Sequence, residues 1–414
     1  MTTLLNILCP SWCDKLISIS SDGENTMTGR IGGVVTLLEK ECSNPVLRIW
    51  CVAHQLDIVV KEATRGLLHE AFYKVAHALS VYLRAQQNLI NDMGSKCPKD
   101  TTRWIAFGGI LSWLLEHRRR LVAHFEEKEP VQAPAPLWWV IAGAVQPFFE
   151  RIAFTFTTVQ SPMMVLSQQR QEVRNLFDDI QLVLQIGSLP HDLDPSTIIE
   201  GGDWYVSKDS IHSLIIDQGS WARDMFHSLE EDDKDLVVEQ VGRFGLFLTA
   251  AGLHIQAERD PQNNPRELEA PHVLPHELVK LRHGEFVTDV VDPFRGHLAK
   301  FWTVHMIDDA EKDHRDLLAA YAREPRLKTI LDTHNEKTFF NAAWDCLQGR
   351  FPLLRQLCGG IATAAFPNTT SVESDFSLVQ WEKDNARMSL TNLSLAGVMH
   401  AKQYAMLKDL AASQ

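Results

Sequence analysis

Two short apolar segments near the N-terminus, separated by a helical segment, constrain the fold of this chain most. Leu16–Ser20 alternates apolar and small polar residues before a Ser-Asp-Gly turn, which is typical of a strand. A helical pattern follows over Asn25–Glu41, interrupted near Gly32-Gly33. Pro45–Val52 has the composition of a second, buried strand, and a helical period resumes at Gln55. This order predicts a right-handed βαβ unit with two parallel strands near Ile17 and Ile49.

The length and charge of the chain narrow the class of protein. It has 414 residues, 45% hydrophobic and 22% charged, which excludes wholesale disorder and allows one large core or several packed subdomains. The net charge of -13 argues against a surface that coats nucleic acid indiscriminately. Residues 1–120 carry net +3, residues 341–414 carry 0 and the middle carries -16. The acidic centre therefore does not exclude DNA as a partner of the two ends.

Cysteine usage and the N-terminal residues indicate the compartment. Seven irregularly spaced cysteines do not form a disulfide framework, and free thiols are expected. The N-terminus has no signal-peptide pattern, and the longest apolar stretch, Pro136–Phe149, is too short to span a bilayer. We expect a nuclear or cytoplasmic protein that is not secreted and has no membrane partner.

Proline and polar segments divide the chain further. Pro130, Pro134 and Pro136 suggest a linker, and Leu137–Phe340 has mainly helical patterning with polar breaks at 188–203 and 259–275. Two final helices are expected at 371–381 and 392–410. The predicted domains are 1–128, the N-terminal part of an α/β core; 129–340, a helical insertion; and 341–414, the C-terminal return of the core. The expected fold class is α/β plus a large all-α insertion, mostly helical overall.

Two carboxylates stand where a site could form. Asp22 follows the first predicted strand, at the carboxyl end where open α/β sheets build their sites. The same aspartate could equally serve the turn or cap the next helix. Glu373 closes the segment Thr370-Ser-Val-Glu373, which has the pattern of a helix capping box. Neither residue points to catalysis without further context.

Three further positions have both a structural and a functional interpretation. Cys51-Val-Ala-His54 has half the spacing of a zinc site, but Cys9 and Cys13 complete it poorly, so no structural zinc is expected. Trp104 fits a core position by default, as most tryptophans do. Arg103 beside it could contact a phosphate or form a salt bridge at a helix start. The glycines between Gly23 and Gly33 match no phosphate-binding loop.

Taken together in this order, four segments resemble transposases of the hAT superfamily. The segments are Ser21-Asp22-Gly-Glu-Asn25-Thr-Met-Thr-Gly29, Trp50-Cys51-Val-Ala-His54-Gln-Leu56, Thr102-Arg103-Trp104, and Thr370-Ser-Val-Glu373-Ser-Asp-Phe376-Ser377 followed by Arg387 and Leu390. The last is similar to the family's C-terminal dimerisation region. The resemblance covers both ends of the chain and hardly any of the middle.

The resemblance implies an RNase H-like core interrupted by a helical insertion, with three carboxylates that bind two Mg²⁺ or Mn²⁺ ions for cut-and-paste transposition of DNA. It implies that Asp22 is the second of these catalytic and metal-binding residues and Glu373 the third. Arg103, Trp104 and His54 are the implied DNA-binding residues. Trp104 or its neighbourhood would support an unstacked base, and His54 would lie near the metals. Homo-oligomers would form through the C-terminal region.

The chain also departs from the family pattern. Only 21 residues precede Asp22, so the strands that carry the family's first aspartate are not expected here, and Asp14 is poorly placed to replace it. The N-terminal zinc finger is missing as well, and Ser374 stands where arginine is frequent. We therefore expect a transposase-derived protein that is N-terminally truncated and catalytically impaired, with a metal cofactor only if active. The alternatives are a non-enzymatic dimerisation or DNA- or protein-binding module, and an active enzyme that extends upstream of Met1.

Overall fold

The computed structural model describes residues 2–43, 46–68, 71–99, 104–161, 163–187, 189, 193–201, 206–253, 258–259, 265–266 and 270–365. The chain is mostly helical, as expected. Within the described residues it has one parallel strand pair and one antiparallel pair of two-residue strands, β3 (Glu258–Arg259) and β4 (Pro265–Arg266). The RNase H-like core therefore stays a prediction. Arg103, Glu373 and the two C-terminal helices predicted after residue 370 lie outside the described residues.

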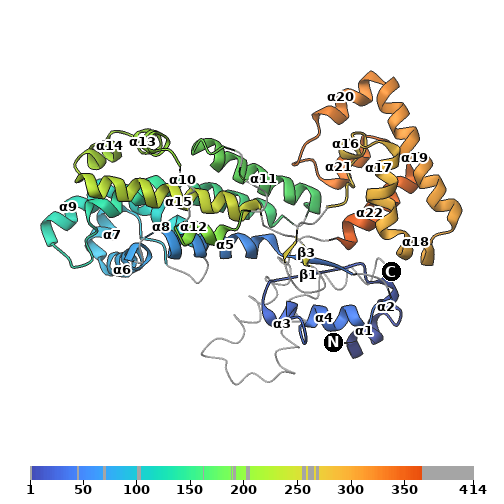
Figure 1. Cartoon of the computed structure of the whole chain (residues 1–414), viewed down its shortest axis with the longest axis horizontal. Helices are drawn as coiled ribbons and strands as arrows, with labels where there is room; N and C mark the ends of the chain where they lie inside the picture. The colour runs from blue at the N-terminus through green and yellow to red at the C-terminus, as the bar shows by residue number, and fades with distance from the viewer. Residues whose placement is uncertain are drawn as a thin grey trace. The chain divides into compact units, whose positions relative to one another are not determined.

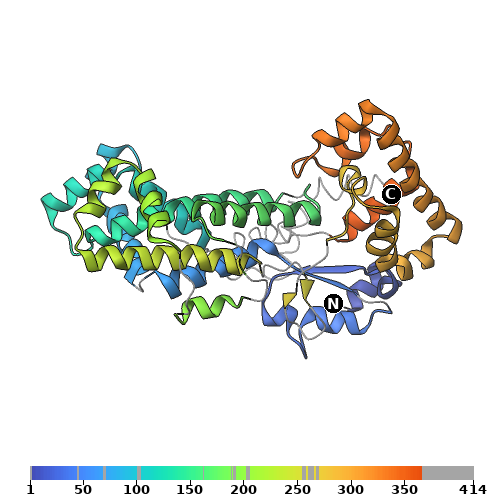
Figure 2. The same cartoon turned by 45° about the horizontal axis from the view of Figure 1, so that its top comes forward.

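The predicted parallel unit is confirmed. Strands β1 (Ser18–Ser21) and β2 (Leu47–Trp50) pair in parallel, with Ser18 opposite Leu47 and Ser21 opposite Trp50, and Figure 2 shows them side by side. The crossover contains two helices, α3 (Asn25–Thr28) and α4 (Val34–Lys40).

Close backbone packing accounts for the break between these two helices. A Cβ atom added to Gly33 would lie 2.3 Å from the backbone nitrogen of Gly29, so only glycine fits there. The predicted interruption is therefore present, slightly wider than the Gly32-Gly33 pair.

A buried ion pair fixes the crossover to the sheet. Arg48 on β2 is 5% exposed and its Nε donates to Glu39 Oε2 on α4 over 2.8 Å. Replacing Arg48 with Met should lower the free energy of unfolding by about 2 kcal/mol, because the carboxylate of Glu39 then stays partly buried without its partner. Urea titration of both proteins measures this difference. The variant Arg48→Lys keeps the charge and should lose less, and equal stability of Arg48→Met and the unmodified protein would contradict the assignment.

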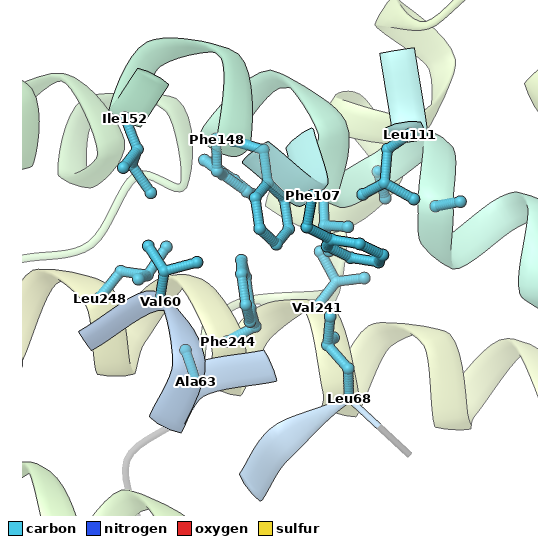
Figure 3. Packing of buried hydrophobic residues seen from close by; sticks show 14 of the residues in the cluster. Val60, Ala63, Leu68, Phe107, Leu111, Phe148, Ile152, Val241, Phe244 and Leu248 are labelled. Atoms are coloured by element: carbon cyan, nitrogen blue, oxygen red, sulfur yellow. The ribbon is translucent and has the colours of Figure 1, made fainter. Parts of the chain in front are cut away.

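The first hydrophobic core is formed by helices on both sides of the proline linker. Helix α15 packs against α5, α10 and α11, and α10 packs against α8 (Figure 1). Figure 3 shows Val60, Phe107, Phe148 and Phe244 from four of these helices meeting in one cluster. The helices are α5 (Val52–Leu67), α6 (Ala71–Ala85), α7 (Gln87–Met93), α8 (Trp104–Glu116), α9 (Arg118–Lys128), α10 (Pro136–Val159), α11 (Leu166–Val183), α12 (Pro195–Ile199), α13 (Lys208–Asp217), α14 (Ser220–His227) and α15 (Glu231–Leu253). The core is thus continuous across the predicted boundary at residue 129.

A second hydrophobic core is formed by residues 273–361, joined by Val165 at the start of α11. Trp344 is 1% exposed and its indole Nε1 donates to the Val273 carbonyl over 3.0 Å. The elements are α16 (Pro275–Leu278), α17 (His283–Phe286), the π-helix η1 (Val287–Val291), the 3-10 helix η2 (Asp292–Phe294), α18 (Arg295–Phe301), α19 (Val304–Arg323), α20 (Pro325–Thr333), α21 (Phe340–Asp345) and α22 (Pro352–Ala364).

The N-terminal segment, with α1 (Thr2–Leu8) and α2 (Trp12–Lys15), is attached to this second core. Lys300 Nζ donates to Asp14 Oδ1 over 2.7 Å, and the Leu16 carbonyl lies 3.2 Å from His297 Nε2. Ile17 packs against the apolar cluster itself. Among the helices with described residues, none is both long and apolar enough to cross a bilayer.

A chain of hydrogen bonds with one possible direction runs from the exposed Arg315 to the buried His314 in the second core. His314 Nε2 is 3.1 Å from the Leu278 carbonyl, which only accepts, so this nitrogen donates. Arg315 Nη1 only donates, so His283 Nε2 accepts from it over 2.8 Å and the proton of His283 is on Nδ1, which donates to His314 Nδ1 over 3.2 Å. Each ring nitrogen of His283 and His314 thus has a fixed role as donor or acceptor. This series of hydrogen bonds therefore requires both imidazoles to be neutral.

Candidate functional site

The carboxyl ends of β1 and β2 meet at one edge of the parallel pair. The Cys51 amide donates to the Ser21 carbonyl over 2.9 Å, so Asp22 and Cys51 follow neighbouring strands side by side. Asp22 is half-buried, and its Oδ1 accepts the Glu24 amide over 3.2 Å. The predicted strand-end aspartate is therefore present at this edge, and one of its oxygens stabilises the turn.

The turn after β1 is held tightly against the end of β2. A Cβ atom added to Gly23 would lie 2.5 Å from the indole Nε1 of Trp50, so the ring covers the turn and leaves room only for glycine. On the other side, Gln55 Nε2 donates to the Trp50 carbonyl over 2.9 Å. These contacts fix Asp22 relative to the first turn of α5.

Helix α5 begins three residues earlier than the sequence pattern predicted. Cys51 is its N-cap residue, and His54 therefore lies in the first helical turn, half-buried, close to the strand ends. Asp57, Lys61 and Arg65 follow at spacings of three and four residues, which places all four side chains on one face of the helix. This face runs from the edge of the parallel pair toward α8.

The start of α8 is attached to the same face of α5. Asp57 Oδ1 accepts the Ile105 amide over 3.1 Å, which caps the first turn of α8. The Arg65 guanidinium lies 4.9 Å from the centroid of the Trp104 ring, and the Tyr73 ring lies 4.4 Å from it. Trp104 is 7% exposed. Trp104 therefore occupies a core position, as most tryptophans do, whereas its contact with an unstacked base stays a prediction.

Asp22 and His54 lie at the N-terminal end of α5, whereas Trp104 packs against Arg65 near the C-terminal end of the same helix. Arg103 and Glu373 lie outside the described residues, so their convergence with these residues is still a prediction. In the part of the chain that the structure describes, no three histidine, cysteine, aspartate or glutamate side chains gather closely enough to hold a metal ion. Asp14 bonds to Lys300 and to Ser43 Oγ, which lowers the pKa of its carboxyl.

A second polar region had no counterpart in the sequence analysis. A cavity of about 970 Å³ lies between the first turns of α11 and residues 270–289, with 334–336 closing one side. Its lining includes three histidines, His272, His276 and His334. Burial lowers the pKa of His276 to about 4 and also lowers that of His334. The walls are distant in sequence and share no motif, so no sequence signal could have identified them.

Comparison of the chain with known protein families and with curated proteins returns no match. The functional interpretation therefore rests on the residues and their geometry.

Proposed function

We propose that this chain is derived from a hAT-type transposase and handles DNA without efficient strand cleavage. The observation that supports the proposal best is the position of α5, which begins beside the strand-end Asp22, carries His54 in its first turn and packs against Trp104 through Arg65. Two of these residues also have structural partners, with Asp22 in its turn and Trp104 against Tyr73 and Arg65. These partners favour a retained framework over an efficient catalytic site.

The exposed side of α5 is the proposed DNA contact. Lys61 and Arg65 are exposed beside the contact between α5 and the start of α8, and their positive charges can pair with backbone phosphates. Mg²⁺ or Mn²⁺, when bound by Asp22 and Glu373, would supply the activation of water or a 3′-hydroxyl that such enzymes need. The carboxylate of Asp22 would hold that ion at the strand end. His54 would orient groups beside it.

Replacing Lys61 with Glu should weaken duplex DNA binding and lower the steepness of its salt dependence by about one ion, because one phosphate contact is lost. Fluorescence anisotropy with labelled duplex at several salt concentrations measures both quantities. Lys312→Glu makes the same charge change at an exposed position of α19 and should leave binding unchanged. If Lys61→Glu and the unmodified protein bind duplex DNA with equal affinity, α5 is not part of the DNA interface.

Cleavage assays test the catalytic half of the proposal. Hairpin and nicked DNA are incubated with the protein and Mn²⁺, and little or no turnover is expected. If the protein cleaves DNA and Asp22→Asn abolishes this cleavage, the proposal of impaired catalysis is wrong and the protein is an active enzyme. The variant should fold normally, because Asn keeps an oxygen that accepts the Glu24 amide.

A dimerisation module without DNA binding is the remaining alternative. It predicts a stable dimer by light scattering at micromolar concentration, together with no measurable affinity for duplex DNA. The proposed function predicts DNA binding in the same preparation, so the two measurements separate these assignments.

A further inference from the structure

The cavity beside α11 belongs to one packed body. Val165, just before α11, lies within the second hydrophobic core, and Gln168 Nε2 donates to the Thr338 carbonyl over 2.8 Å. The N-terminal end of α11 is further fixed by Gln168 Oε1, which accepts the Val165 amide over 3.1 Å. The two walls are therefore held together by the packing of Val165 and by the hydrogen bond between Gln168 and Thr338.

Several polar atoms in the cavity lining are buried without a partner. Ser167 Oγ, His276 Nδ1 and His334 Nδ1 have no hydrogen-bond partner within the described residues. His276 is 6% exposed, and its ring stands perpendicular to that of His334 with the centroids 5.8 Å apart. A buried polar atom left unsatisfied destabilises a fold, because its hydrogen bonds to water are lost without replacement. A ligand that bonds to these atoms would recover that free energy.

Charge is distributed unevenly between the two walls. Arg170 and Arg174 are one helical turn apart on α11, so the first wall is cationic. The opposite wall carries Lys280, the imidazoles and three carboxylates, Glu277, Asp289 and Glu336.

Two of these carboxylates already have hydrogen-bond donors from the protein. Glu277 Oε2 accepts the amides of Val273 and Leu274 over 3.2 and 3.1 Å, and Asp289 Oδ1 accepts the Thr288 hydroxyl over 2.8 Å. The lining thus presents cationic groups on one wall and hydrogen-bond acceptors on the other, which suits a ligand that is anionic at one end and carries hydrogen-bond donors at the other.

We propose that this cavity binds a nucleotide, with its phosphate against Arg170 and Arg174 and its base against His276, His334 and Glu336. Guanidinium groups bind phosphate through paired hydrogen bonds, and amino groups of a base can donate to the carboxylate and to neutral imidazoles. At about 970 Å³ the cavity is large enough, since small-molecule sites span about 300–1,000 Å³. The ligand is either a free nucleotide or one nucleotide of a single DNA strand.

Titration of the protein into a fluorescent ADP, and separately into a labelled single-stranded hexanucleotide, tests this assignment. We expect saturable ADP binding with a Kd of about 100 μM or tighter, which corresponds to a few good hydrogen bonds. The double variant Arg170→Ala/Arg174→Ala should bind at least about tenfold more weakly, because both proposed phosphate contacts are removed. A hexanucleotide that binds more tightly than ADP and competes with it assigns the site to DNA.

Two further variants make the result decisive. Arg326→Ala/Lys312→Ala removes the same charges from exposed positions outside the cavity and should bind ADP within about twofold of the unmodified protein. Ser167→Ala removes one buried hydroxyl with little risk to folding and should weaken binding about threefold. The proposal is overturned if neither probe saturates, or if folded Arg170→Ala/Arg174→Ala and Ser167→Ala bind like the unmodified protein. Neither result depends on binding of duplex DNA by α5.

Discussion

Acidification from about pH 7.5 to pH 5 is expected to lower the free energy of unfolding by about 4 kcal/mol through two buried histidines. His276 and His314 are the groups responsible, and burial lowers the pKa of each to about 4. His314 is completely buried, and its ring stacks on Phe286 with the centroids 4.1 Å apart. Its Nε2 donates to the Leu278 carbonyl, which opposes the effect of burial without cancelling it.

The sign of this effect follows from proton binding. An unfolded histidine titrates near pH 6.5, whereas these two stay neutral in the folded protein until about pH 4. Between these values the unfolded state binds more protons, so stability is fully present above about pH 6.5 and is lost as the pH falls toward 4. The groups near His276 are His334, Lys280 and Glu336, and those near His314 are His283 and Arg315.

Urea unfolding curves at several pH values measure this loss directly. The variant His314→Gln, which keeps an N–H donor, should be less stable at pH 7.5 but should lose only about 2 kcal/mol on acidification to pH 5. His305→Gln, at an exposed position of the same helix, should behave like the unmodified protein. Equal acid losses for His314→Gln and the unmodified protein would show that another group is responsible. Burial raises the pKa values of the Glu172 and Asp313 carboxyl groups. Their protonation at lower pH therefore favours the folded state and opposes the effect of the two histidines.

Replacing Phe244 with Ala is expected to lower the free energy of unfolding by about 3–5 kcal/mol, because a large ring is deleted from the first core. Phe244, labelled in Figure 3, is completely buried. Its ring stacks on that of Phe149 with the centroids 5.8 Å apart. Val241 and Leu248 lie on the same helix in this cluster, so the surrounding side chains have little freedom to fill the space.

Phe154→Ala provides the matched control for this substitution. It deletes the same ring from α10, but at a position that is 64% exposed, and should change the free energy of unfolding by less than about 0.5 kcal/mol. Urea or thermal unfolding followed by tryptophan fluorescence measures both variants. Similar losses for the two variants would contradict the position of Phe244 in the core.

The parallel strands could be predicted from the sequence because their pattern is local. The alternation over Leu16–Ser20 and the apolar run over Pro45–Val52 place β1 and β2 within two residues of their observed positions. The glycines that separate α3 from α4 are a local signal as well. Helix α12 falls in a segment read as a polar break, although Asp194 before Pro195 is a usable helix-start signal.

Long-range contacts account for what could not be predicted. The start of α8 depends on Asp57, which is distant in sequence and whose carboxylate gives no sign of its partner. The packing of Trp104 against Arg65 and Tyr73 likewise depends on how α5, α6 and α8 meet. The cavity beside α11 is lined by α11 and by residues 270–289 and 334–336, which are distant from it in sequence. Each of these segments has the pattern of an ordinary amphipathic or polar stretch.

The hydrophobic core that continues across the proline linker determines how the chain could be divided. Expressed separately, residues 1–128 and 129–414 would each expose one side of the packing between α8 and α10 and between α5 and α15. Each fragment would then present a large apolar surface and aggregate. Produced together in one cell, the two fragments would bury those surfaces against each other, so this exposed linker is a natural position for a split-protein complementation system.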